Sequence, residues 1–173
     1  EIIKNNFINP NTISYISTAP LRCLLRFDDN IYPQYVQNTY FEDQINIIKA
    51  LSHHKFKIIV RLDKEDRWFH NNYLKKKIKF KNILINDGKS NFDKNFKNSS
   101  IILVDYLGSS HLNSLLLNKP TIIYCNKKFN FIKKNKKKYF NRLKKASIFF
   151  DNIKELILFL NKLNSEEKIK KWW

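Results

Sequence analysis

The sequence predicts an α/β fold: a Rossmann-like open parallel sheet of about six strands with helices on both faces. Short aliphatic runs recur along the 173 residues, separated by longer stretches whose apolar residues have helical spacing. The aliphatic runs are nearly unbroken, which is typical of strands buried on both faces. A chain of this length can bury a core of ordinary size, so one main domain is expected.

Each element has its own signal in the sequence. The expected strands are residues 13–17, 56–62, 83–86, 100–105, 121–125 and 147–150. The expected helices are residues 37–52, 70–77, 92–96, 109–118 and 130–144, followed by one that Asp151 caps. Residues 1–163 therefore form the predicted Rossmann-like domain. Residues 164–173 form a further helix that begins at Asn164 or Ser165, with glutamates in its first turn.

The formal net charge of +18 is the most unusual feature of the composition. A charge of this size is compatible with nucleic acid, an anionic membrane surface or an anionic substrate as partner. Only five of the 33 basic residues are Arg, the residue that bidentate phosphate or base recognition favours, which argues against nucleic acid. Lys is abundant together with Asn, Ile and Phe, so a general coding bias also explains many lysines at solvated positions.

The sequence lacks the motifs of several common classes of binding site and enzyme. It contains no GxGxxG dinucleotide fingerprint, no GxxxxGK[ST] loop and no GxSxG nucleophile elbow. Cys23 and Cys125 are far apart and the histidines have no metal-ligand spacing, so we expect reduced cysteines, no metal and a cytoplasmic location. The chain has no Met and starts at Glu1, so we expect a fragment of a longer protein.

The segment VDYLGSSHLNSLLL is the main candidate for chemistry. An aliphatic strand ends in Asp105, and Gly108 then permits a tight turn and a close backbone approach. Ser109 and Ser110 lie where the first helical turn leaves unpaired amides, which favours a bound phosphate. Ser109 could instead cap the helix, and the same geometry serves both purposes. His111 follows directly and could reach the ligand.

Arginines end two other expected strands. Arg22 follows the first strand and Arg61 lies at the end of the second. An arginine at the mouth of a parallel sheet can neutralise a phosphate through its forked donors. Arg61 could instead form a structural ion pair with Asp63, Asp66 or Asp105, and Arg22 could be a solvated loop residue.

The same stretches resemble a known family. DYLGSSHLNSLLLNKPTIIYCN resembles the motif D-Y-x-G-T-T-x-L-E-x-L-x-x-N-x-P-T-I-x-F-W-N, and ISTAPLR, IIVRLD, YFNRLKKASIFFDN and IKKWW resemble further family segments in the same order. The family consists of transferases assigned to bacterial surface-carbohydrate biosynthesis, first identified in spirochaetes. More distantly, the chain is similar to CDP-glycerol glycerophosphotransferases and other GT-B glycosyltransferases.

The resemblance implies the C-terminal, donor-binding half of a metal-independent GT-B glycosyltransferase for surface polysaccharide. Arg22, Arg61, Asp105, Gly108, Ser109, Ser110, His111 and Asn113 are then the expected donor and phosphate contacts. The donor is a nucleotide-activated sugar, the acceptor is a carbohydrate or a lipid-linked molecule, and no cofactor is implied. The general base is expected in an N-terminal domain outside this sequence, so this part alone should be inactive.

One departure from the motif leaves alternatives open. Asn113 stands where the family has Glu, so donor choice or activity itself could differ, and an inactive structural relative is one alternative. A basic nucleic-acid-binding α/β domain is another, based on the net charge. The lysine-rich helix at 130–144 could also bring the protein to anionic lipid at the inner face of the cytoplasmic membrane.

Overall fold

The computed structural model describes residues 11–17, 34–62, 64, 70–89, 96–126 and 132–173. Its centre is a six-stranded sheet in the order β3-β2-β1-β4-β5-β6, and every neighbouring pair is parallel. The strands are β1 (Thr12–Ile16), β2 (Lys57–Arg61), β3 (Ile83–Asn86), β4 (Ile101–Val104), β5 (Thr121–Tyr124) and β6 (Phe149–Phe150). The predicted Rossmann-like parallel sheet is confirmed.

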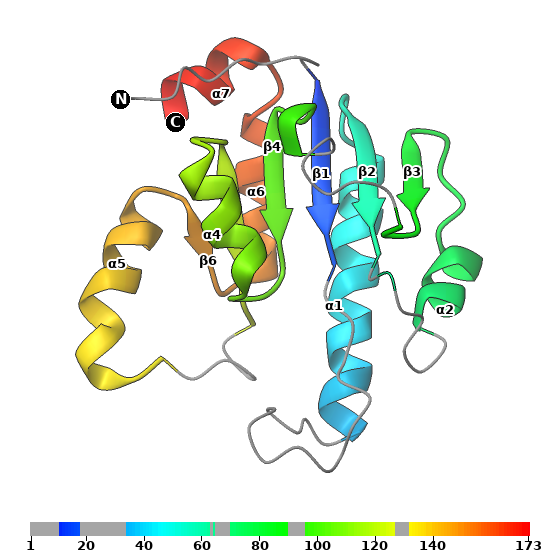
Figure 1. Cartoon of the computed structure of the whole chain (residues 1–173), viewed down its shortest axis with the longest axis horizontal. Helices are drawn as coiled ribbons and strands as arrows, with labels where there is room; N and C mark the ends of the chain where they lie inside the picture. The colour runs from blue at the N-terminus through cyan, green and yellow to red at the C-terminus, as the bar shows by residue number, and fades with distance from the viewer. Residues whose placement is uncertain (1–10, 18–33, 63, 65–69, 90–95, 127–131) are drawn as a thin grey trace.

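Helices connect the strands, as Figure 1 shows. They are α1 (Gln34–Ser52), α2 (His70–Lys77), α4 (Ser109–Leu116), the 3-10 turn η2 (Lys134–Lys136), α5 (Lys137–Lys145), α6 (Ile153–Lys162) and α7 (Glu166–Trp172). The expected short helix at 92–96 lies almost entirely outside the described residues.

Alternate residues of each strand pack into two separate cores, which explains the unbroken aliphatic runs. Ile101 and Leu103 of β4 point into the core that includes residues of α1, α2, α6 and α7. Ile102 and Val104 of the same strand point to the opposite face, where α4 and α5 pack. Because both faces are covered, every residue of β4 is buried.

The strand order places a topological switch point between β1 and β4. From β1 the chain crosses through α1 to β2 on one side, whereas from β4 it crosses through α4 to β5 on the other side. Ile16 pairs with Val104 at the carboxyl ends of these two strands. The connections diverge there, so this is the position at which open parallel sheets bind ligands.

Several predicted boundaries differ from the structure, and three of the differences are informative. Asn152, rather than Asp151, caps α6: its Oδ1 accepts from the Lys154 amide at 2.9 Å, while Asp151 forms an ion pair with Lys144 at 2.5 Å. Within the expected helix at 130–144, the described residues form the 3-10 turn η2 followed by α5, and residues 130 and 131 lie outside the described part. Strand β6 has only two residues, since the positive φ of Ser147 (56°) interrupts an extended strand.

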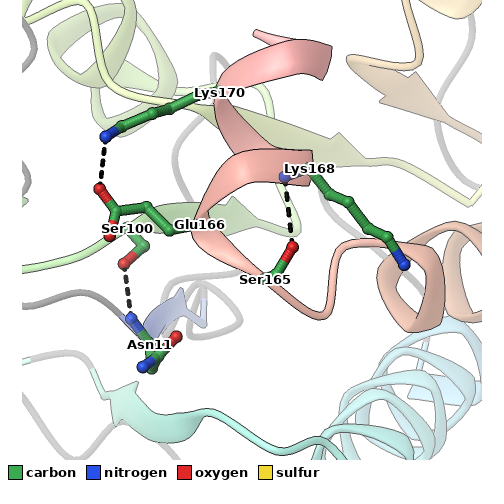
Figure 2. Close-up of polar contacts among 6 residues, drawn as sticks. All are labelled: Asn11, Ser100, Ser165, Glu166, Lys168 and Lys170. Carbon is green, nitrogen blue, oxygen red and sulfur yellow. Dashed lines mark hydrogen bonds and ion pairs between the residues drawn. The ribbon is translucent and has the colours of Figure 1, made fainter.

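The C-terminal helix begins where the sequence predicts. The Ser165 hydroxyl accepts from the Lys168 amide at 3.3 Å, and Glu166 forms an ion pair with Lys170 one turn later at 2.6 Å (Figure 2). The same view shows the Asn11 amide donating to the Ser100 hydroxyl, a contact of 3.1 Å that joins the start of β1 to the residue before β4. Both features belong to the structural framework.

The C-terminal tryptophan pair, Trp172 and Trp173, forms hydrogen bonds between the end of α7 and the turns that precede β5 and β6. The Trp172 indole donates to the Ala146 carbonyl at 2.9 Å, and the Trp173 indole donates to the Asn118 side chain at 2.9 Å. The Trp172 ring also packs edge-on against Phe159 of α6. The tryptophans of the IKKWW segment therefore stabilise the amino edge of the sheet.

In the part of the chain that the structure describes, no helix combines the length and the apolar composition needed to cross a bilayer.

Candidate functional site

The start of α4 lies at the switch point, directly after β4. Gly108 is the N-cap residue, with extended backbone angles (φ −130°, ψ −166°), and Ser109 is the first helical residue. Glycine has no side chain, so it cannot supply the oxygen that usually accepts from the amides of the first turn. Those amides carry the partial positive charge of the helix start and point out of the sheet edge, which is the geometry that binds phosphate.

A side chain at Gly108 would also crowd the neighbouring Tyr106 ring. A Cβ at this position would lie 3.0 Å from Cδ1 of Tyr106 and 3.3 Å from its Cε1. The Tyr106 side chain is 37% exposed, so an aromatic ring lies at the surface directly beside the helix start. The sequence analysis did not single out Tyr106, although it belongs to the D-Y-x-G motif.

The two serines follow the N-cap residue and do not cap the helix. Ser109 is exposed and Ser110 is half-buried in the first turn of α4. The alternative in which Ser109 caps the helix is wrong, because the cap position belongs to Gly108. Both hydroxyls are therefore placed beside the first-turn amides, where they could add donors for an anion.

His111 completes the first turn. Burial lowers the pKa of its imidazole below the usual 6.5, and the Gly108 backbone partly opposes this shift. The ring is therefore neutral at pH 7 and can act as a hydrogen-bond donor or acceptor without adding charge. Its carbonyl accepts from the buried Ser114 hydroxyl at 2.9 Å, which ties the turn to the inner side of α4.

Asp105 is the centre of a buried polar network. Its side chain is 2% exposed, and Oδ2 accepts from the Tyr15 hydroxyl at 2.6 Å and from the Gln44 amide at 2.8 Å. The Tyr40 hydroxyl donates to the Asp105 carbonyl at 3.2 Å. This network joins β1, β4 and α1 directly beneath the turn that leads to Gly108, so Asp105 positions that turn from the inside.

Burial and the Asp105 carboxylate both raise the pKa of Tyr15, with burial the larger cause. The phenol therefore keeps its proton and acts as the donor in its bond to Asp105. A second network lies on the same side of the sheet edge, where Asp43 of α1 accepts from the Tyr124 hydroxyl at 3.0 Å and from the Asn126 amide at 2.5 Å. Together the two networks hold the first half of α1 against the ends of β1, β4 and β5.

Arg61 lies at the carboxyl end of β2, but its side chain is engaged within the protein. It is 9% exposed, and Nη2 donates to the Gly88 carbonyl at 2.8 Å, which ties β2 to the loop after β3. Its Cα pairs with Ile16, which in turn pairs with Val104, so Arg61 lies two strands, about 10 Å, from the end of β4. Arg22 lies outside the described residues, as do Asp63 and Asp66.

Asn113 is exposed in the second turn of α4. One short segment from β4 into α4 thus holds Asp105, Gly108, Ser109, Ser110, His111 and Asn113. Arg61 approaches the same edge from a different strand. The phosphate contacts predicted for the helix start lie together, whereas Asp105 lies underneath them.

Sequence reasoning missed the partners of Asp105. One signal could have revealed Gln44: it lies on the apolar stripe formed by Phe41, Ile45, Ile48 and Leu51, where a polar side chain needs a buried partner. Tyr15 gives no such signal, because a tyrosine within an aliphatic strand reads as ordinary core.

The fold and this edge define an α/β protein with an uncapped helix start at the switch point of a parallel sheet, an arrangement suited to phosphate-containing ligands. Residues 3–173 match the family model described as LIC12162 family transferase. The chain therefore belongs to the LIC12162 family of transferases. Comparison with curated protein sequences gave no match.

Proposed function

We propose that this chain is the donor-binding half of a GT-B-like glycosyltransferase for bacterial surface polysaccharide and holds a nucleotide-activated sugar by its diphosphate. The observation that carries the proposal is the start of α4 at the switch point, where Gly108 leaves the first-turn amides uncapped. Family membership supports a transferase. The phosphate-binding geometry supports a donor that carries phosphate.

The division of labour at the site follows from burial. The amides after Gly108 and the hydroxyls of Ser109 and Ser110 contact the diphosphate and stabilise the negative charge that develops on it as the sugar leaves. Asp105 does not contact the donor: its buried carboxylate fixes the β4–α4 turn so that the amides are preorganised. Tyr106, exposed beside Gly108, offers a ring face for the base or the sugar.

The acceptor in this proposal is a carbohydrate or a lipid-linked molecule that approaches the same carboxyl edge. The described residues bind the donor and stabilise its leaving group. The group that deprotonates the acceptor is assigned to another part of the enzyme.

Calorimetric titration of UDP, CDP and GDP against the protein tests the proposal. Removing both hydroxyls in Ser109→Ala/Ser110→Ala should weaken binding by about 100-fold or more, because hydrogen bonds to a charged group contribute about 1.5–3 kcal/mol each. Ser52→Ala is a matched control, since its hydroxyl bonds only the Lys49 carbonyl at the far end of α1. Unchanged affinity in the double variant would remove the phosphate role from the helix start.

Asn113 favours one competing function, a relative that has lost activity. The exposed position of Asn113 means that Asn113→Glu should change the free energy of unfolding by no more than about 0.5 kcal/mol. If the site is active, this variant should shift the preference between nucleotide-sugar donors and leave the affinity for the bare diphosphates unchanged. Transfer activity that appears only in Asn113→Glu would identify the natural chain as an inactive relative.

A further inference from the structure

The outer side of α4 carries a leucine pair that the fold does not use. Leu112 is 55% exposed and Leu116 is 74% exposed, one helical turn apart. Both lie about 160° around the helix from Ser114, the fully buried residue that marks the inner side of α4. The pair therefore points directly away from the sheet.

The outer side of α5 carries a row of cations. Phe140 and Leu143 face the sheet, where the Phe140 ring packs edge-on against Phe149 at 5.0 Å. Lys138, Arg142 and Lys145 recur at the spacing i, i+4 and i+7 on the opposite side, and all three are exposed.

These two rows belong to one layer of the molecule. Both helices pack on the same sheet face, with Leu117 after α4 and Leu143 of α5 in one core around Ile123. In Figure 1, α4 and α5 are neighbours on the side of β4 away from β1. We call the surface formed by Leu112, Leu116, Lys138, Arg142 and Lys145 the outer face.

The approach to α5 adds further positive charge at an unusual position. Lys133, Lys134, Lys136 and Lys137 lie at or before the helix start, and the first turn contains no acidic residue. This is the reverse of the favourable arrangement with the helix dipole. Helix α7 of the same chain has the favourable arrangement, with two glutamates first and lysines last. An external anion would relieve the repulsion at the start of α5.

The lysine-rich start of α5 lies toward the carboxyl edge of the sheet, the same edge as the candidate site. The chain leaves the carboxyl end of β5, passes through η2 and α5, and enters β6, which is parallel to β5. The start of α5 therefore lies toward the carboxyl edge and its end toward the amino edge, as Figure 1 shows. Anything bound at this start lies beside the edge to which α4 presents its first turn.

We propose that the outer face docks on an anionic phospholipid surface. Cations beside exposed leucines match a bilayer interface, where headgroups carry the negative charge and acyl chains accept the leucines. Nucleic acid would match the cations and leave the leucines in water, so the pair favours lipid. Docking by this face lays the sheet roughly parallel to the bilayer, with the carboxyl edge beside the membrane surface. It deepens the proposed function by presenting the site to a lipid-linked acceptor, but it does not depend on donor binding.

Flotation with vesicles of equal parts phosphatidylglycerol and phosphatidylcholine tests the proposal at physiological salt. Lys138→Gln/Arg142→Gln should weaken binding roughly 10- to 30-fold, from the contribution of each basic residue near an anionic surface. Lys75→Gln/Lys76→Gln is the matched control, because it makes the same charge change at exposed positions of α2, whose Leu74 packs in the opposite core. This control should bind as the natural protein does.

Substitution of the two leucines distinguishes a lipid surface from other anionic partners. Leu112→Ser/Leu116→Ser should weaken vesicle binding about tenfold. Leu158→Ser, at a 64% exposed position of α6, should not weaken it. Nucleotide affinity should be unchanged in all these variants, so failure here is distinct from failure of the proposed function.

Three results would overturn the proposal. The first is equal loss of vesicle binding in the α2 and α5 charge pairs. The second is an unchanged affinity in the double leucine variant. The third is tighter binding of a short RNA or DNA duplex that depends on the same cations, which would identify a nucleic-acid surface instead.

Discussion

Asp105 offers the sharpest test of how the site is held together. The sequence analysis placed it among the donor contacts, whereas the structure buries it beneath the turn, where Oδ2 accepts from Tyr15 at 2.6 Å and from Gln44 at 2.8 Å. A positioning role predicts that Asp105→Ala mainly costs folding stability. A direct contact with the donor predicts that it mainly costs binding.

The magnitude follows from the two hydrogen bonds. Each bond to a charged acceptor contributes about 1.5–3 kcal/mol, and Asp105→Ala leaves both donors buried without this acceptor. Part of this loss is offset, because the variant no longer buries a carboxylate. We expect a net loss of about 3 kcal/mol in the free energy of unfolding. Asp105→Asn keeps a neutral acceptor, and neutral hydrogen bonds are roughly half as strong, so about 1–2 kcal/mol is expected.

Urea denaturation followed by tryptophan fluorescence measures these differences. A double-mutant cycle between Asp105→Asn and Tyr15→Phe should give a coupling free energy of at least about 0.5 kcal/mol, since the two groups bond directly. Asp87→Asn is the control, because its carboxylate accepts only from the exposed Lys89 amide, and it should cost under about 0.5 kcal/mol. A loss below about 1 kcal/mol in Asp105→Ala, with nucleotide binding abolished, would refute the positioning role.

Two further predictions concern the framework. His54 is neutral in the fold, with Nδ1 accepting from the Phe56 amide at 3.2 Å, and burial lowers its pKa below 6.5. As pH falls, His54 therefore binds a proton in the unfolded chain before it does so in the folded protein, so the free energy of unfolding should decrease below about pH 6.5. Urea midpoints measured across this pH range should decrease less in His54→Gln than in the natural protein. Trp172→Ala should cost about 3 kcal/mol by thermal or urea unfolding, because it removes the packing on Phe159 and the bond to Ala146. A change under about 1 kcal/mol would contradict the role assigned to the tryptophan pair.

The fold could be predicted from the sequence because period and residue type agree along most of the chain. Strands such as β4 consist only of aliphatic residues, and the intervening helices repeat their apolar residues at helical spacing, so parallel pairing was the consistent solution. Boundaries failed where a local effect decided the outcome. The positive φ of Ser147 shortened β6, and Asn152 displaced Asp151 as the cap of α6.

The strand-to-helix turn that carries the candidate site was predictable from the sequence, but the contacts beneath it were not. Glycine and serines at a strand-to-helix turn indicate a phosphate site regardless of the tertiary structure. The burial of Asp105 and the internal bond of Arg61 to Gly88 depend on partners 27 to 90 positions away in sequence, which no local pattern reveals. The sequence therefore located the start of α4 correctly but could not show which of the predicted contacts are exposed and which are buried beneath the turn.

Gly108 distinguishes the start of α4 from the starts of α6 and α7, and exchanging it tests the phosphate role directly. Asn152 and Ser165 cap α6 and α7 with side-chain oxygens, whereas Gly108 leaves the equivalent amides without a side-chain acceptor. In Gly108→Ser the new hydroxyl can accept from these amides. The gain of a few tenths of a kcal/mol that this cap offers over glycine should be largely offset by displacement of the Tyr106 ring, which lies 3.0 Å from the new Cβ.

The free energy of unfolding should therefore stay within about 0.5 kcal/mol of the natural protein. Nucleotide affinity should fall about tenfold, because the serine hydroxyl competes with the phosphate for a backbone N–H of the first turn. Ser165→Gly, the reverse exchange at α7, should lower stability by a few tenths of a kcal/mol and leave nucleotide binding unchanged. Calorimetry on both variants compares the two caps. Full nucleotide affinity in Gly108→Ser would mean that the donor does not use the amides of α4, because a side-chain cap and a phosphate cannot both accept from the same N–H.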